Sequence, residues 1–312
     1  MSLFFPASLA SPLERGCFAF LLLITYSLLG WCGEMVYCSI GQRRLCEKRG
    51  FLNGPLCPIY GHGALVVLLV LDGGCEHPAL TFLLGALLTS LVEYVTSYAM
   101  EKLFRMRWWD YSHYRFHING RVCLLNSVLF GLASVFLCHA ANPPIAARLS
   151  GLFAAGAGVP LALALGVLYG ADIAISVRSA IRIGDRLAKL HAIHRELAEK
   201  LDALRAEQQR AAEAQRQRLE EAVSAARQSA GERAALARQS VQARLEPLAD
   251  LGDEFALRLE EAKNEAQQKL HALYQCQDFF ERRLLRSFPA LRSLRHGEAL
   301  ARWREYLARR KK

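Results

Sequence analysis

The feature that most constrains this chain is a series of long apolar runs within its first 177 residues. A helix needs about 20 apolar residues to cross the roughly 30 Å of hydrocarbon in a bilayer. A further run, Ile59–Leu71, has 13 residues and would reach only about 20 Å as a helix. We therefore expect residues 1–177 to form an all-α, polytopic membrane bundle of about five transmembrane helices. The four long runs are Cys17–Tyr37, Pro78–Met100, Val122–Ala141 and Leu152–Val177.

Charge is distributed unevenly along the chain. Of the 68 Lys, Arg, Asp and Glu residues only 20 precede Arg178, so the later part is expected to be exposed to water. The formal net charge of +10 would fit a nucleic-acid surface. The basic residues of the first part, however, flank the apolar runs, where the positive-inside rule accounts for them. We therefore expect contact with the lipid bilayer, including its anionic headgroups, and no nucleic-acid partner.

The links between the apolar runs predict the orientation, because cytoplasmic links are enriched in Lys and Arg. The links 38–58 and 101–121 are basic, as is the segment that starts at Arg178. By contrast, the link Asp72–His77 has two acids and no Lys or Arg, and the only basic residue of Ala140–Ser150 is Arg148. This pattern predicts a multi-pass protein with its N-terminus outside and its tail in the cytoplasm.

The first part of the tail, residues 178–246, predicts a long helix or coiled coil. It is rich in Ala, Leu, Arg, Glu and Gln, which favour helix, and it contains a heptad seam with one polar interruption. Such a helix would serve self-association or the docking of another cytoplasmic protein, or it would be a solvated single helix. The seam consists of Leu187, Leu190, His194, Leu197, Leu201 and Leu204.

The second part of the tail, residues 247–312, predicts amphipathic helices. Pro247 and Gly252 are expected to interrupt the preceding helix, because proline and glycine are the strongest helix breakers. Two helices would then follow, at about Phe255–Phe288 and Pro289–Lys312, with Pro289 marking the break between them.

The segment 49–63, RGFLNGPLCPIYGHG, interrupts the apolar pattern with prolines and glycines. Irregular backbone at membrane depth is tolerated where protein or a water-filled cavity satisfies its polar groups. Broken segments of this kind line the substrate sites of transporters. Asn53, Pro55, Pro58 and Tyr60 are therefore candidates for a substrate or ion pathway. The alternative is a turn of the cytoplasmic link that dips into the interface before a short, steep helix.

Acidic side chains within the predicted spans form a second candidate group. Glu34 lies in the first span, and Glu93, Ser97 and Glu101 recur at steps of four, which places them on one helix face. Because a charge in hydrocarbon costs at least about 2.5–3.5 kcal/mol, Glu93 is expected to face the bundle interior and to find a partner. The acids would bind a cation or a proton, or would form a structural ion-pair network. The candidate basic partners are Arg49, Arg121 and the cluster Lys102–Arg107.

The segment 108–121, WWDYSHYRFHINGR, combines aromatic and basic residues at a predicted membrane boundary. This combination is typical of an interfacial belt, although stacked Trp and Arg could also bind a ligand or a partner's helix. Asp110 could cap a short interfacial helix, and Asn119–Gly120 predicts a turn. The histidines form no metal pattern, so no metal ligand is assigned. The structural motif of both segments comprises Arg49, Trp108, Trp109, Asp110, Tyr111, Asn119, Gly120 and Arg121.

Two further patterns bear on packing and activity. Gly166 and Gly170 form a G-x-x-x-G pair, which is typical of close packing between membrane helices, and Asp172 is expected at the interface. The sequence contains no G-x-x-x-x-G-K-[ST] phosphate loop, nucleophile elbow, H-E-x-x-H motif or dinucleotide fingerprint. We therefore predict no enzyme, no catalytic residue and no cofactor.

At about residues 27–131 the chain resembles a bacterial membrane family, the putative ABC-transporter type IV (ABC transporter permease-like) family. His117 departs from the residue, usually Asn, that is typical of this place, and the tail lies outside the resemblance. The family implies a permease that works with a separate ATPase in the bacterial cytoplasmic membrane. The resemblance rests on the whole segment 49–63, the run from Glu93 through Glu101 to Trp109–Ser112, Gly120-Arg121, and Gly30-Trp31 with Glu34.

Three functional hypotheses follow. The first is a permease-like transport subunit of unknown substrate, in which Glu34, Glu93 and the segment 53–63 line a cytoplasm-facing site and a separate ATPase supplies energy. The second is a membrane-anchored scaffold or sensor with a cytoplasmic coiled-coil docking arm. The third, a membrane enzyme acting on lipid, is disfavoured because the sequence shows no nucleophile–base pair of the usual kind.

Overall fold

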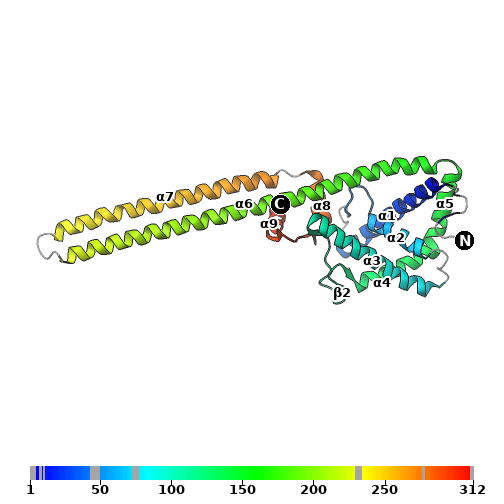
Figure 1. Cartoon of the computed structure of the whole chain (residues 1–312), viewed down its shortest axis with the longest axis horizontal. Coiled ribbons are helices and arrows are strands. Elements are labelled where there is room, and N and C mark those ends of the chain that lie inside the picture. The colour runs from blue at the N-terminus through cyan, green and yellow to red at the C-terminus, as the bar shows by residue number, and fades with distance from the viewer. Residues whose placement is uncertain are drawn as a thin grey trace. The chain divides into compact units, whose positions relative to one another are not determined.

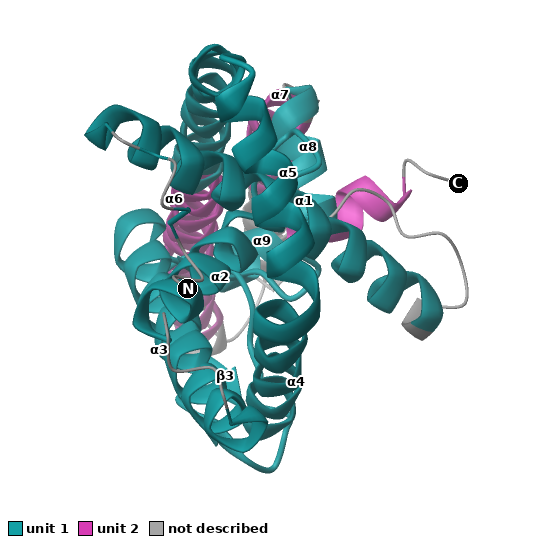
Figure 2. Ribbon diagram, turned by 90° about the vertical axis from the view of Figure 1, so that its right-hand side faces the viewer, with its two compact units in different colours: residues 1–185, 278–300 teal, residues 186–277, 301–312 magenta. Residues whose placement is uncertain are grey.

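The computed structural model describes residues 5–6, 9, 11–42, 50–71, 77–228, 234–275 and 278–309. These residues belong to two compact units (Figure 2). Unit 1 combines residues 1–185 with 278–300, and unit 2 combines residues 186–277 with 301–312. The apolar runs therefore share a unit with a segment from near the C-terminus.

The helices of unit 1 begin at residues that suit a first turn. At the start of α1, the Ser11 N–H donates to Glu14 Oε2 and the Glu14 N–H donates to Ser11 Oγ, both at 3.1 Å. Helices α2 and α3 each begin with a proline, whose missing N–H removes no helical bond there. The helices are α1 (Pro12–Gln42), α2 (Pro58–Val70), α3 (Pro78–Phe104), α4 (Leu124–Phe136), α5 (Asn142–Ala154) and α6 (Gly158–Gln228), with a π-helical turn, η1 (Leu137–Ala141).

Four of the described helical segments are long and apolar enough to cross a membrane, which confirms the predicted helical membrane fold class. Helix α2 has 13 residues and is not among them, so the predicted fifth span stays a prediction. Two of its apolar side chains, Val67 and Leu68, are fully buried within the protein. The four segments are Pro12–Ile40, Pro78–Phe104, Leu124–Ala154 and the apolar part of Gly158–Glu221.

Residues Ala140–Ser150, the predicted outer link, are helical, and the chain turns at residues 155–157. The outer position of this link stays a prediction. The two prolines after Asn142 occupy the first turn of α5, where they remove no helical bond. The π-helical turn η1 joins α4 to α5 without a loop. Asn142 is buried, and its Oδ1 accepts a 2.8 Å hydrogen bond from the Tyr26 hydroxyl of α1.

Small residues bring α1 and α2 into close contact. A Cβ added to Gly61 would lie 2.3 Å from Ser27 Oγ and 2.5 Å from the Leu23 carbonyl oxygen. A Cβ added to Gly30 would lie 2.4 Å from Tyr60 Cβ. Helix α2 also packs on α3, and α3 packs on α4. The segment 49–63, which we call the first polar segment, therefore reaches the place where α1, α2 and α3 meet.

Unit 2 contains the second part of α6 and helix α7 (Ala234–Gln275), which run side by side in opposite directions (Figure 1). Lys200 Nζ lies 3.5 Å from Glu265 Oε2, and Arg258 Nη1 lies 3.5 Å from Glu207 Oε1. The Arg186 guanidinium donates to the Leu273 carbonyl at 2.7 Å. Every residue of the predicted heptad seam is buried or half-buried.

The expected interruptions of the tail are partly wrong. Helix α7 continues through Pro247 and Gly252, so the local cost of a helix-interior proline, about 3 kcal/mol, does not end this 42-residue helix. The break at Pro289 is confirmed: α8 (Phe279–Ser287) ends just before it, because the residue preceding a proline disfavours the α conformation. The last helix, α9, spans Gly297–Arg309 and starts later than predicted.

The segment between α8 and α9 forms a short strand, β4 (Arg292–Ser293), in place of the predicted helix. It pairs antiparallel with β1 (Met106–Arg107), with Met106 opposite Ser293. A second ladder joins β2 (His117–Ile118) to β3 (Val122–Cys123). The turn between β2 and β3 has positive φ at Asn119 (52°) and Gly120 (67°), which confirms the predicted turn.

Candidate functional site

The first polar segment forms a loop, residues 50–57, which an acidic side chain of α6 binds. The backbone N–H groups of Asn53 and Gly54 donate to the two carboxylate oxygens of Asp172, at 2.8 and 2.7 Å. The Asn53 side-chain amide also donates to Asp172 Oδ1 at 2.8 Å and to Ser176 Oγ at 3.1 Å. The Asp172 carboxylate therefore satisfies donors that an irregular loop would otherwise leave without partners.

Asp172 is a site residue that the sequence pattern missed, since that pattern predicts only an interfacial position for it. It lies 119 positions from Asn53, so no local spacing connects the two. The available signal was an acidic side chain within an apolar run, because such a group needs a partner.

A basic side chain binds the same loop through its carbonyl groups. The Arg283 guanidinium of α8 donates to the Gly50 carbonyl at 3.2 Å and to the Phe51 carbonyl at 2.7 Å. Arg283 is 9% exposed, and its burial lowers the pKa of the guanidinium below its ordinary value, while the charge of Asp172 acts in the opposite direction. Nothing in the sequence pattern pointed to Arg283, which lies more than 230 positions from the loop.

Directly after the loop, α2 places a tyrosine on the first candidate acid. The Tyr60 hydroxyl donates to Glu34 Oε2 at 2.6 Å, and Glu34 is half-buried on α1. The Cys57 N–H donates to the Ser27 carbonyl at 3.0 Å, which fixes the start of α2 against α1. The loop, α2 and Glu34 thus form one connected structure.

A second tyrosine contacts the second candidate acid. The Tyr111 hydroxyl donates to Glu93 Oε1 at 3.1 Å. Burial, and then the adjacent Glu93 carboxylate, raise the pKa of the Tyr111 hydroxyl above its ordinary value, so this group remains a donor. Glu93 is 4% exposed, and its Oε2 makes no hydrogen bond of ordinary geometry with the described residues. Helix α2, which carries Tyr60, packs on both α1 and α3, the helices of Glu34 and Glu93, and we call the two acid–tyrosine pairs the acid–tyrosine cluster.

Of the three candidate basic partners of Glu93, neither Arg121 nor the cluster Lys102–Arg107 forms an ion pair with it, and Arg49 lies outside the described residues. The Arg121 guanidinium lies 2.9 Å from Glu101 Oε1 and donates to Ser97 Oγ at 3.3 Å. Glu101 also accepts from Arg107 Nε at 3.1 Å. Glu93, Ser97 and Glu101 do share one face of α3, but the two arginines meet its far end, about 12 Å along the helix axis from Glu93.

The two tryptophans of the segment 108–121, which we call the second polar segment, differ in their exposure to solvent. Trp108 is 2% exposed and packs edge-on against Phe51 and Phe104, with ring centroids 5.2 and 5.6 Å away. Trp109 is half-buried, and its Nε1 donates to the Arg121 carbonyl at 3.1 Å. Trp108 therefore joins the two polar segments, and Trp109 fixes the backbone beside the Arg121 ion pair.

Asp110 does not cap a helix, because no helix follows it: residues 112–116 form turns and bends. Its Oδ1 accepts from the Ser112 N–H at 3.0 Å and from the Ser112 hydroxyl, and its Oδ2 lies 2.8 Å from Arg292 Nη1. Burial alone would raise the pKa of Asp110. The hydrogen bonds from Ser112 and the charges of Arg292 and Arg107 outweigh it and hold the pKa of Asp110 below its ordinary value.

The remaining candidate residues have structural places or lie outside the described part. Pro58 is the first residue of α2, and Pro55 belongs to the loop that Asp172 and Arg283 bind. The Asn119 amide donates to the Tyr94 hydroxyl at 3.0 Å. Arg49 lies outside the described residues. Within the described part of the chain, no three His, Cys, Asp or Glu side chains gather as a metal site would require.

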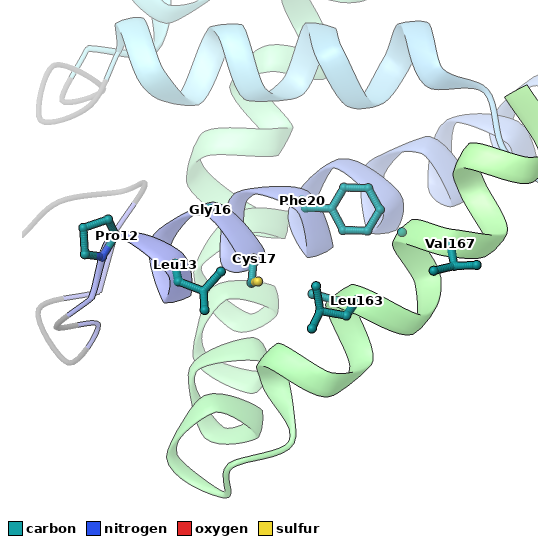
Figure 3. A pocket seen from close by; sticks show the side chains of 9 residues that line it. Pro12, Leu13, Gly16, Cys17, Phe20, Leu163 and Val167 are labelled. Carbon is teal, nitrogen blue, oxygen red and sulfur yellow. The ribbon is translucent and has the colours of Figure 1, made fainter.

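A separate groove of about 540 Å³ lies between the starts of α1 and α6 (Figure 3). Its lining is apolar and includes Cys17, Phe20, Leu163 and Gly166. The predicted close packing of the G-x-x-x-G pair is wrong within the described chain, because a Cβ on Gly170 would meet no atom within 4 Å. The groove offers no polar side chain to orient a ligand, so it is not the candidate site.

Comparison with known proteins matches residues 21–177 to one family, described as putative ABC-transporter type IV. No curated protein and no solved structure matches the chain. The matched region covers half of the chain and includes both polar segments, both acid–tyrosine pairs and Asp172, whereas Arg283 and Arg292 lie beyond it. The four membrane-length helices agree with this assignment. The chain therefore belongs to the putative ABC-transporter type IV family of membrane proteins.

Proposed function

We propose that this protein is a permease-like transport subunit whose site is the cluster of Glu34–Tyr60 and Glu93–Tyr111. The observation that carries the proposal is the environment of Glu93. It is a buried acid in a membrane-length helix, with the Tyr111 hydroxyl as its hydrogen-bond donor, Asn126 as a further polar neighbour and no ion pair to another described residue. Because an unpaired charge in hydrocarbon is costly, such an acid binds a proton or a small cation.

The remaining features of the proposal concern orientation and energy. The basic links support an orientation with the N-terminus outside and the tail in the cytoplasm, and we assign the protein to a bacterial cell membrane as part of this proposal. The site would open towards the cytoplasm, where the loop 50–57 meets α2. The sequence has no phosphate-binding loop of its own, so a separate ATPase, the partner that the family description suggests, would supply the energy.

The test is ion movement in proteoliposomes that contain the full chain and any ATPase that co-purifies in mild detergent. An internal pH-sensitive dye reports protons, and a potassium-sensitive dye reports a monovalent cation. Glu93→Gln should abolish the flux, and Tyr111→Phe should reduce it. Glu196→Gln, an exposed residue of α6, is the control. Normal flux in Glu93→Gln would exclude the assigned role of this acid.

The scaffold or sensor is supported by a different observation: α6 runs without interruption from a membrane-length segment into the hairpin with α7. The Glu207–Arg258 contact allows the hairpin to be shortened, by replacing residues 208–257 with a glycine-rich turn. A scaffold would lose its binding partners in this variant and keep them in Glu93→Gln. The transport subunit would show the opposite sensitivity in the flux assay.

A further inference from the structure

A C-terminal segment outside the family match binds both polar segments of the membrane unit. We name residues 278–294 the C-terminal clasp. It comprises α8 and β4, and it begins three residues after α7 ends. All of its contacts described below lie within unit 1. Since the family match ends at residue 177, the clasp is an addition of this chain to the matched region.

The clasp and Asp172 bind opposite polar groups of the loop 50–57. Asp172 accepts from the N–H groups of Asn53 and Gly54, while Arg283 of the clasp donates to the carbonyls of Gly50 and Phe51. Hydrogen bonds to charged groups are stronger than neutral ones. The conformation of the loop therefore depends on one charged group from the matched region and on another from the clasp.

An aromatic contact strengthens the docking of the clasp. The Phe288 ring packs edge-on against Trp108, with centroids 5.0 Å apart, on the same indole that Phe51 and Phe104 contact. Edge-on aromatic pairs contribute roughly 0.5–1.5 kcal/mol beyond their buried area. Trp108 is 2% exposed with the clasp docked.

The contact with the second polar segment is short. Strand β4 forms two residue pairs with β1, and the Leu294 N–H donates to the Arg105 carbonyl at 3.2 Å. Arg292 pairs with Asp110 at 2.8 Å, although the Arg292 side chain is 72% exposed. An isolated two-stranded ladder is marginal in water, so docking of the clasp depends mainly on its side chains, which include the buried Leu284, Leu285 and Leu291.

The clasp binds the loop 50–57 and the second polar segment, and both are adjacent in the chain to residues of the acid–tyrosine cluster. The loop 50–57 leads directly into α2, which carries Tyr60, and Asp110 precedes Tyr111 in the chain. We propose that the clasp is a regulatory element: when docked, it holds Tyr60 on Glu34 and Tyr111 on Glu93, and its release loosens both contacts. Its regulatory role rests on the proposed transport site, whereas its docking does not. A partner that binds the hairpin of α6 and α7, which precedes the clasp in the chain, would be the means of release.

The test is amide hydrogen exchange of the full-length protein in lipid nanodiscs. Arg283→Ala should accelerate exchange at Gly54 and Tyr60 by about tenfold or more, as expected for the loss of hydrogen bonds to a charged group. Arg282→Ala, which removes an exposed neighbour on α8, is the matched control. Unchanged exchange in Arg283→Ala, or equal acceleration in both variants, would overturn the proposal.

A cross-link separates release of the clasp from misfolding. Met106 and Ser293 face each other across the ladder, at the Cα separation that a disulfide requires. The double variant Met106→Cys/Ser293→Cys should form this disulfide and slow exchange of the Leu294 amide of the ladder in the Arg283→Ala background, whereas Gly54 should still exchange faster because the Arg283 hydrogen bonds to the loop remain absent. Failure of the disulfide to form in folded protein would contradict the docked clasp. Glu93→Gln should leave amide hydrogen exchange in the clasp unchanged. The proposal of a transport site and the proposal of a docked clasp can therefore be rejected independently of each other.

Discussion

The two units use charged residues in different ways. In unit 1 the ion pair of Arg121 with Glu101 is largely buried, with side-chain exposures of 7% and 14%. In unit 2 the pair of Lys200 with Glu265 is about half exposed, at 47% and 52%. Buried charges need their partners, because water no longer solvates them, whereas exposed pairs gain little from each other. The comparison teaches that ion pairs fix the geometry of unit 1 and mainly keep the hairpin of unit 2 soluble.

The largest expected effect follows from breaking the buried pair. Arg121→Ala leaves Arg107 as the remaining described ionic partner of Glu101. It also removes the guanidinium group that donates a hydrogen bond to Ser97 Oγ. Breaking a buried ion pair costs about 3–5 kcal/mol when no other partner remains, so a loss of about 3 kcal/mol is expected here. The free energy of unfolding in mild detergent, measured by denaturant titration, checks this value. A loss below about 1 kcal/mol would mean that the pair is solvated.

The next effect concerns packing in unit 1. Gly61→Ala places a methyl group 2.5 Å from the Leu23 carbonyl, and overpacking of this kind costs about 1–3 kcal/mol. Gly33→Ala is the matched control on α1, because its Cβ would meet no atom within 4 Å. Thermal unfolding followed by tryptophan fluorescence should show a lower midpoint for Gly61→Ala only. Equal midpoints would show that α1 and α2 do not pack as closely as described.

A smaller effect concerns the pH dependence of the clasp. The hydrogen bonds from Ser112 and the nearby arginines hold the pKa of Asp110 below its ordinary value in the folded protein. A carboxylate with a lowered pKa stabilises the fold above its ordinary pKa and loses this contribution as the pH falls through the lowered value. Exchange at Leu294, corrected for its intrinsic rate, should therefore be constant between about pH 5 and pH 8. Release of the clasp near neutral pH would point to a different titrating group.

The smallest effect is expected in unit 2. Lys200→Ala removes the contacts with Glu265 and Glu196, yet these groups are exposed to water. The midpoint of thermal unfolding and its salt dependence should match those of the unaltered protein. A clear loss of stability would show that exposed ion pairs also stabilise unit 2, which would contradict the proposed difference between the two units.

Much of the candidate site could be predicted from local spacing. The step of four along α3 predicts that Glu93, Ser97 and Glu101 share a face, and they do. The turn at Asn119–Gly120 and the helix break at Pro289 also follow from local residue preferences. The partner of Glu93 could not be predicted, because several basic residues were compatible with the same helix face and only packing selects among them.

The sequence by itself determined the membrane-type helical fold and the family, because apolar run length and the two polar segments are local properties of the chain. Only the tertiary structure decided which charged group binds which segment. Asp172 and Arg283 reach the loop 50–57 from positions more than 100 residues away. No spacing rule connects residues at such separations, since their contact depends on how the helices pack and on where the chain returns after α7.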